Sequence, residues 1–543
     1  MATAEKILAR ADEAKTERAT WDTLTQDLAN YVMPRKAHIT DKEQHPSTDK
    51  VSQLFDSTAI QANTTLGQGQ MSYLSPHDDQ WFEFRPPYQL KSNDRVIKYY
   101  EECTFIAAQE LALSNFYTEV HEMYLQRSGF GTAAMFQTEL DGQLYFRNYD
   151  FGTYSIVEDV NGFVDEFYRE WQVSARQLRT MFPDSETTMP SQVRELWGTP
   201  KEMDKKFDMI HAVLPRDAMD RGPDVKGPEG MPFASIYILR QGMTKVHESG
   251  FTRFPFLVTR YLRWSNSLQG PYGWCPTMAA LADIRQVNLL QKYMDVLAEV
   301  SAFPRILKPS DLDGEVDLRA GGITQFNPYN QQALPKEWAT QGRYDIGKDR
   351  IEMRQKAIKE HFHTDLFRMF AELDRGAQMS IRETVERSSE KLAQFSPTFT
   401  RLISEGFNPM LKRTFELLTA MGKFPDPPPE LVEPRLDGKG DRMPDPQLQY
   451  TSRLAMALNS IQNSAALQTL EAIMPMAQVD PTILDTFNMD NYIRGFARNA
   501  GVPEDWLRDT AEVQAIREQR AAMQQERMEL ENQQMAQEAA APK

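Results

Sequence analysis

Cysteine is scarce in this sequence, with only Cys103 and Cys275 among 543 residues. Two cysteines imply no disulfide framework, which fits assembly in a reducing cytoplasm. Apolar runs of about 18 residues are also missing, so we expect no membrane-spanning helix. The N-terminal segment MATAEKILARADEAK is charged and lacks the apolar core of a signal peptide. The composition, 25% charged and 41% hydrophobic, is typical of soluble globular proteins.

Basic residues are in deficit, since 61 Lys and Arg face 77 Asp and Glu and the net charge is −16. This balance argues against tight, sequence-reading DNA binding, which needs a basic surface. It does not argue against a DNA conduit, because an acidic wall repels the polymer toward the axis of a channel. Charge alone fits an ordinary acidic protein equally well.

The common catalytic motifs are absent. The sequence has no G-x-x-x-x-G-K-[ST] phosphate loop, no H-E-x-x-H and no G-x-S-x-G. His361 and His363 with Asp365 form a local metal-like cluster, but histidines at i and i+2 of a helix point to different faces. We therefore expect no catalytic residue, no metal and no cofactor, and any ATP-driven motor must be another protein.

The first 275 residues are expected to combine helices with a small antiparallel sheet. Period-two alternation over 133–170, with Asp141-Gly142 and Asn161-Gly162 between the runs, predicts β-hairpins. Further strands are predicted at 81–84, 210–215, 235–239 and 256–264. Helices are predicted at 1–35, 51–73 (with a break near Gly67 and Gly69), 94–130, 173–182 and 191–197.

Two long helices follow, over 276–304 and 347–370, with a Gly- and Pro-punctuated block between them. The chain is therefore expected to run out along one helix, form a small β-bearing tip and return along the other. Such a hairpin buries little by itself, so its apolar faces should pack between copies in a closed ring. The residues predicted to do so are Val287, Leu290, Met294 and Leu297.

Several segments occur in a telling order: LFDSTAIQANTTLGQGQMSYLSPHDDQWFEF, YGWCPTMAALADIRQVNLL, the DLRAGGI turn, and Met379-Ser380 with Glu383 at the start of a long helix. In this order, and over nearly the whole chain, the sequence resembles the portal (head-to-tail connector) proteins of T7-like, short-tailed bacteriophages. The order of the segments, more than any single motif, carries the resemblance.

The resemblance implies a mainly α fold with small antiparallel β-sheets (α+β), the phage portal fold, assembled as a ring that is a dodecamer in the family. Its implied parts are a wing (1–275), stem helices (276–304 and 347–370), a clip (305–346), a tunnel loop (371–382), a kinked wing helix (383–425), a crown (426–505) and a C-terminal helical tail or barrel (506–543). The kinked helix is predicted to bend near Pro397 and Pro409.

The resemblance also implies function: a ring-shaped channel at one capsid vertex, through which double-stranded DNA passes non-specifically during packaging and ejection. The implied partners are the terminase large subunit, the tail adaptor and nozzle proteins, the major capsid and scaffolding proteins and internal core proteins. No membrane is involved. The implied location is the virion, at the head-tail junction, after assembly in the bacterial host cytoplasm.

The family's arrangement places the candidate site residues in the channel and in the clip. The DNA-channel candidates, in the stem and the tunnel loop, are Lys356, Lys359, Arg375, Gln378 and Arg382. The clip candidates for binding terminase and then the tail adaptor are Asp311, Asp313, Arg319, Asn327 and Tyr329.

Two other classes of protein compete with this interpretation. A non-enzymatic coiled-coil scaffold or internal virion structural protein should carry sustained a/d heptads, which the helices lack. A carboxylate-dependent nuclease would need acidic residues clustered at strand ends together with basic substrate contacts, and the sequence does not exclude it. A ring with a central hole in electron micrographs would favour the portal.

Overall fold

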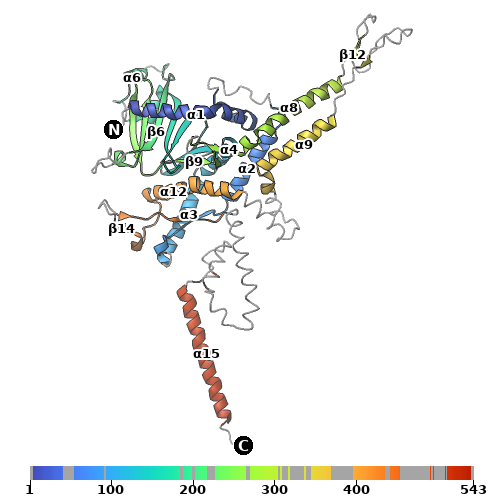
Figure 1. Cartoon of the computed structure of the whole chain (residues 1–543). Helices are drawn as coiled ribbons and strands as arrows, with labels where there is room; N and C mark the ends of the chain where they lie inside the picture. Colours follow the sequence, from blue (N-terminus) through green and yellow to red (C-terminus); the bar gives the residue numbers. More distant parts are fainter. Residues whose placement is uncertain are drawn as a thin grey trace. The chain divides into compact units, whose positions relative to one another are not determined.

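The chain divides into two compact units, Met1–Gln449 and Tyr450–Lys543. In the first unit, helices pack against two antiparallel sheets, and a helical hairpin extends from this body (Figure 1). The expected class, helices with small antiparallel sheets, is confirmed. The computed structural model describes residues 4–40, 54–90, 93–183, 188–197, 202–216, 227–264, 270–303, 306–308, 316–317, 336–337, 344–368, 395–434, 441–452, 490, 493, 508 and 510–539.

α1 (Ala4–Val32) confirms the predicted N-terminal helix and lies across one face of the larger sheet (Figure 1). The helix ends before Pro34, which opens the 3-10 turn η1 (Pro34–Lys36), because proline fits a first turn but not a helix interior. Apolar side chains of α1 and of three strands form the core at this face: Ile7, Leu8, Ala11, Ala14, Tyr168, Ile210, Ala212, Ala234, Ile236 and Ile238.

α2 (Thr58–Leu74) begins later than predicted, and the predicted break at its glycines is wrong. Gly67 and Gly69 are buried where α2 touches its neighbours. A Cβ at Gly67 would come within 2.6 Å of Leu125 Cδ2, and one at Gly69 would overlap the ring of Phe367. Glycine here permits close packing between helices, which the local sequence does not distinguish from a helix break.

The helix predicted over 94–130 is two helices, α3 (Asp94–Leu113) and α4 (Phe116–Phe130). A tertiary contact accounts for the interruption. The side-chain amide of Asn115 donates to the Phe146 carbonyl at 2.7 Å and accepts from the Phe146 N–H at 2.9 Å. Asn115 thus pairs with an edge strand instead of continuing the helix.

The single predicted sheet is two sheets. A three-stranded sheet has the order β3-β2-β9, and a five-stranded sheet has the order β4-β5-β6-β7-β8. Both predicted hairpins are confirmed, and the β2–β3 turn has positive φ at Asp141 (52°) and Gly142 (75°), as a type I′ turn requires. The strands are β2 (Thr132–Leu140), β3 (Gln143–Tyr149), β4 (Tyr154–Glu158), β5 (Val164–Ser174), β6 (Lys206–Pro215), β7 (Phe233–Leu239), β8 (Thr244–Phe251) and β9 (Phe256–Arg260).

Two short helices confirm their predictions and close the second face of the larger sheet: α5 (Ala175–Met181) and α6 (Ser191–Leu196). Ser174 opens α5 with a reciprocal capping box to Gln177. The apolar cluster beneath them includes Val173, Leu178, Phe182, Met189, Val193, Leu196, Phe207, Met209, Leu239 and Val246.

The predicted out-and-back hairpin is present. α8 (Pro276–Ala302) and α9 (Tyr344–His361) pack side by side and extend away from the sheets (Figure 1). At the far end, β12 (Ile306–Leu307) pairs with β13 (Lys336–Glu337). At the near end, β10 (Leu262–Arg263) pairs with β11 (Gly273–Trp274), one residue before Cys275 caps α8.

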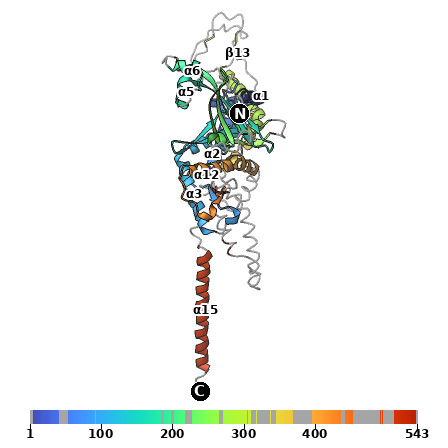
Figure 2. The same cartoon turned by 90° about the vertical axis from the view of Figure 1, so that its left-hand side faces the viewer.

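A long interrupted helix follows α9 in the chain. Residues 395–402 are helical, Ile403–Phe407 form a π-turn (η6), and α12 (Asn408–Ala420) continues. The irregularity therefore lies between the two prolines at which bends were predicted. η6 contacts β9 and α12 contacts β2, so this helix lies along the smaller sheet. Figure 2 shows α12 below the strands, next to α3.

Small elements complete the first unit. β1 (Phe82–Arg85) pairs with β16 (Gln447–Tyr450), where the first unit ends. The others are η2 (Tyr88–Leu90), η4 (Pro228–Gly230), η7 (Pro429–Leu431), and the pair β14 (Glu433–Pro434) and β15 (Asp441–Arg442). In the second unit, residues 510–539 form the helix α15 (Thr510–Ala539). The predicted crown, 426–505, is described only at 426–434, 441–452, 490 and 493.

Candidate functional site: the α8–α9 hairpin and its anchorage

One face of α8 packs against α9. Met294 lies against Gly347, where a Cβ would meet its thioether, and Asp283 pairs with Arg354. Side chains on this face are therefore covered, wholly or in part, within one chain. The predicted packing residues are buried (Val287) or half-buried (Leu290, Met294 and Leu297).

A second face of α8 carries large apolar side chains that are exposed. Leu289, Tyr293 and Val296 are 49%, 59% and 49% exposed. Their spacing, i, i+4 and i+7, aligns them along the helix, and we call them the outer stripe. Apolar spacing did not predict this stripe, because Leu289 and Leu290 are both apolar and periodicity does not tell which of the two faces the chain's own core.

Charged side chains of α9 form ion pairs with one another along the helix. Lys348 lies 3.7 Å from Glu352, and Lys356 lies 4.0 Å from Glu360, each pair one helical turn apart. Exposed pairs of this kind contribute only about 0.3–0.5 kcal/mol. Of the two DNA-channel candidates on α9, Lys356 has a side chain 79% exposed, whereas Lys359 is half-buried.

α9 ends earlier than the 370 predicted, at His361. His363 adopts φ 51°, outside the right-handed helical region. A short helical segment then begins at Thr364. The two histidines are thus separated by a break, not placed on one continuous helix. Among the described residues, no group of three His, Cys, Asp or Glu side chains could hold a metal.

Eight of the predicted site residues lie outside the described residues. They are the clip candidates Asp311, Asp313, Arg319, Asn327 and Tyr329, and the tunnel-loop candidates Arg375, Gln378 and Arg382.

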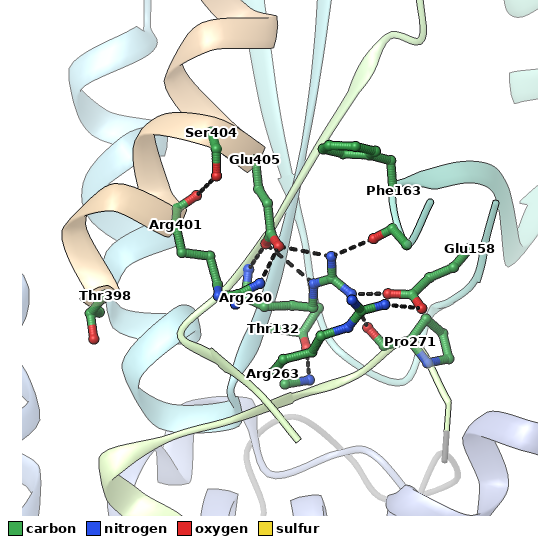
Figure 3. Close-up of polar contacts among 12 residues, drawn as sticks. Thr132, Glu158, Phe163, Arg260, Arg263, Pro271, Thr398, Arg401, Ser404 and Glu405 are labelled. Atoms are coloured by element: carbon green, nitrogen blue, oxygen red, sulfur yellow. Dashed lines mark hydrogen bonds and ion pairs between the residues drawn. The ribbon is translucent and has the colours of Figure 1, made fainter. Parts of the chain in front are cut away.

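A buried polar network anchors the interrupted helix to the body, and the sequence analysis did not find it. Figure 3 shows Arg260 of β9 between Glu405 of η6 and Glu158 at the end of β4. Arg260 is 2% exposed, and its Nη2 lies 2.8 Å from Glu405 Oε1. Arg401 and Arg263 add outer pairs to Glu405 (2.8 Å) and Glu158 (2.9 Å). No local pattern signals contacts between residues more than 100 positions apart.

Two further buried arginines join this helix to the body. Arg127 of α4 donates from Nη2 to the Thr398 carbonyl at 2.7 Å. Arg413 of α12 donates to the carbonyls of Gln137 and Arg253, both at 3.2 Å. Burial lowers the pKa of each guanidinium to about 10, because charge is costly away from water. Leaving a buried neutral donor without its acceptor costs about 1–3 kcal/mol, and a charged donor costs more.

Both cysteines are fully buried, and burial raises the pKa of each thiol to about 12. A thiol without thiolate character is a poor nucleophile. Within the part of the chain that the structure describes, no helix is long and apolar enough to cross a membrane.

Comparison with known proteins identifies the family. The profile of the family described as "Bacteriophage head to tail connecting protein" matches residues 4–507. The "Probable portal protein" of Bordetella phage BPP-1 is 26% identical over 531 residues, covering 96% of this chain and 91% of the relative. The "Portal protein" of Salmonella phage epsilon15 is 26% identical over 532 residues, covering 96% and 92%. These matches confirm the resemblance found in the sequence, and the chain belongs to the family of bacteriophage head to tail connecting proteins.

Proposed function

We propose that this chain is the subunit of a portal ring, a non-enzymatic channel at one capsid vertex through which double-stranded DNA is packaged and ejected. Two relatives that cover nearly the whole chain are named portal proteins, which supports this proposal. The number of subunits that the family suggests is twelve. The ring would dock the terminase large subunit during packaging and the tail adaptor and nozzle afterwards.

The observation that carries the proposal is the outer stripe. Leu289, Tyr293 and Val296 lie in line on a helix that already packs against α9 through another face. A monomer gains nothing from such a stripe, because exposed apolar surface costs about 25 cal/mol per Å² relative to burial. A neighbouring copy that covers it with a different face makes a heterologous contact, and repetition of that contact closes a ring.

The remaining assignments follow the family's arrangement. Residues 1–275 and 383–425 form the wing, the α8–α9 hairpin the stem, and 426–505 the crown. Residues 305–346 form the clip, where Asp311, Asp313, Arg319, Asn327 and Tyr329 meet the terminase and then the tail adaptor. Residues 371–382 hang into the channel, and their Arg375, Gln378 and Arg382, with Lys356 and Lys359 of the stem, touch phosphates without reading bases. The major capsid, scaffolding and internal core proteins surround this assembly.

The test replaces one residue of the outer stripe with a charge. Val296→Asp should prevent ring closure while leaving the chain folded, because the side chain faces away from its own core. The matched control is Ala298→Asp, which introduces the same charge at an exposed position two residues from Val296, on the opposite side of α8. Negative-stain images and light scattering should show rings for the parent and the control, and monomers with unchanged circular dichroism for Val296→Asp. Rings formed equally well by Val296→Asp would refute the interface, and a parent without rings would refute the portal.

A further inference from the structure

The helix that continues as α12 holds one residue too many for a regular α-helix. Residues 395–402 have α-helical form, and then the N–H of Asn408 bonds the carbonyl of Ile403 and closes the π-turn η6. A π-turn spans i to i+5, so it contains one residue more than an α-turn. The residues before η6 are therefore one position out of step with α12.

A carboxylate inside this π-turn is held by β9. Glu405 Oε2 accepts from the backbone N–H of Arg260 at 2.9 Å and from its Nε at 3.2 Å, while Oε1 accepts from Nη2 at 2.8 Å. The next residue, Gly406, lies so close to β9 that a Cβ would come within 2.7 Å of Thr259 Cγ2. The π-turn is thus seated on the strand by a buried ion pair and by close backbone packing.

The helix is also fixed on both sides of η6. On the N-terminal side, Arg127 joins the Thr398 carbonyl to the Arg260 carbonyl, at 2.7 and 3.2 Å. On the C-terminal side, Arg413 bonds the Gln137 carbonyl of β2. Arg127 bonds a backbone carbonyl, which every residue carries, so this anchor holds the helix in place without deciding which residue occupies that position.

We infer that the buried Arg260–Glu405 pair sets the register of this helix, and that residues 395–402 adopt a second register, one residue on, when the pair is lost. Converting the π-turn to an α-turn would rotate these residues by about 100° and move them by about 1.5 Å. With α12 held in place, Phe399 would then occupy the present position of Thr398. In some proteins a buried polar or ionic group specifies one register among several while adding little stability.

This inference does not rest on the proposed function, because it concerns the register of one helix within one chain. It gives the network of Figure 3 a role in setting that register. In this network Arg260 lies between Glu158 of the sheet and Glu405 of the helix. The register decides which side chains of residues 395–402 face the body and which face outward.

The rate at which introduced cysteines react with a maleimide reports the register of residues 395–402. Thr398 is buried and Thr400 is exposed, while native Cys103 and Cys275 are fully buried and should stay silent. In the full chain, Thr400→Cys should react with a maleimide faster than Thr398→Cys by about tenfold or more, because thiol reactivity follows exposure. In the Glu405→Gln background the order should reverse, since residue 398 moves to the exposed position of 397 and residue 400 to the buried position of 399.

Two further variants make the result decisive. Arg401→Gln removes only the outer partner of Glu405 and should leave the order unchanged. Deletion of Ser404, whose hydroxyl donates only to the Arg401 carbonyl, removes the surplus residue and should restore the original order in the Glu405→Gln background. If Glu405→Gln keeps the parental order, or if both cysteines become fast and the deletion does not restore the difference, the pair does not set the register and the inference fails.

Discussion

At the scale of single residues, His211 makes stability depend on pH. It is fully buried in β6, its ring is stacked on Tyr237 at 4.1 Å, and its Nε2 lies 2.9 Å from Ser235 Oγ. Burial, with the nearby charge of Arg169, lowers its pKa from 6.5 to about 3. The folded chain thus keeps this ring neutral at a pH where the unfolded chain protonates it.

The sign of the effect follows from linkage. As pH falls from about 6.5 toward 3, the unfolded state binds the proton first, so His211 lowers the free energy of unfolding by up to about 1.4 kcal/mol per pH unit. His211→Phe with Ser235→Ala removes both hydrogen-bonding partners and should reduce the loss of Tm between pH 7 and pH 5. Ser235→Ala alone keeps the buried imidazole and should retain the pH dependence. An unchanged pH dependence in the double variant would show that His211 is protonated in the fold.

At the scale of the helix, Gly69 tests the packing of α2. Alanine would favour the helix by about 1 kcal/mol in isolation. Its Cβ would overlap the Phe367 ring, however, and such overpacking costs about 1–3 kcal/mol. Gly69→Ala should therefore lower the Tm of the full chain, whereas Gln68→Ala, at the exposed neighbouring position, should leave it unchanged or slightly higher. A Tm for Gly69→Ala at or above the parent's would refute this close contact.

Helices and hairpins were largely predictable because their signals are local. The turns at Asp141-Gly142 and Asn161-Gly162 identify their hairpins, and apolar spacing identifies α1 and α8. The division into two sheets was not predictable, because it depends on the pairing of Thr132 with Arg260 across more than 100 residues. The break at Asn115 likewise depends on a tertiary contact.

The candidate site divides in the same way. The α8–α9 hairpin and the burial of Val287 follow from spacing and length. The outer stripe does not, because spacing alone cannot tell which of two apolar faces a helix buries. The Arg260–Glu405 pair joins residues 145 positions apart, and neither residue is unusual in its own segment.

At the scale of the whole molecule, the proposed channel predicts a role for residues 371–382. Deleting residues 373–379 should leave rings and empty heads, because these residues carry only two large apolar side chains, Leu373 and Met379. It should shorten the DNA that filled heads retain, because a few exposed contacts per subunit resist slippage while remaining weak and salt-sensitive. The readout is the length of DNA extracted from heads, measured on pulsed-field gels.

A variant of unchanged length separates the charge of this segment from its bulk. Arg375→Ser with Gln378→Ser keeps the chain length and removes the proposed phosphate contacts. An intermediate loss of retained DNA would assign part of the effect to these two side chains. Full-length genomes held stably by the deletion variant would mean that the segment only connects two helices.

The packing of the interrupted helix on the smaller sheet also has a consequence in time. Gln137 of β2 donates a hydrogen bond to Thr414 of α12, 277 residues later in the chain. Arg127 likewise bonds Thr398, which is synthesised much later. At about 5–20 residues per second, the ribosome needs roughly 14–55 s to deliver the second partner after the first. During that interval α4 and β2 can pack against each other and against α2, but the side chains that the interrupted helix covers stay exposed. Synthesis of this subunit therefore passes through a long, aggregation-prone stage that ends only when residue 420 leaves the ribosome.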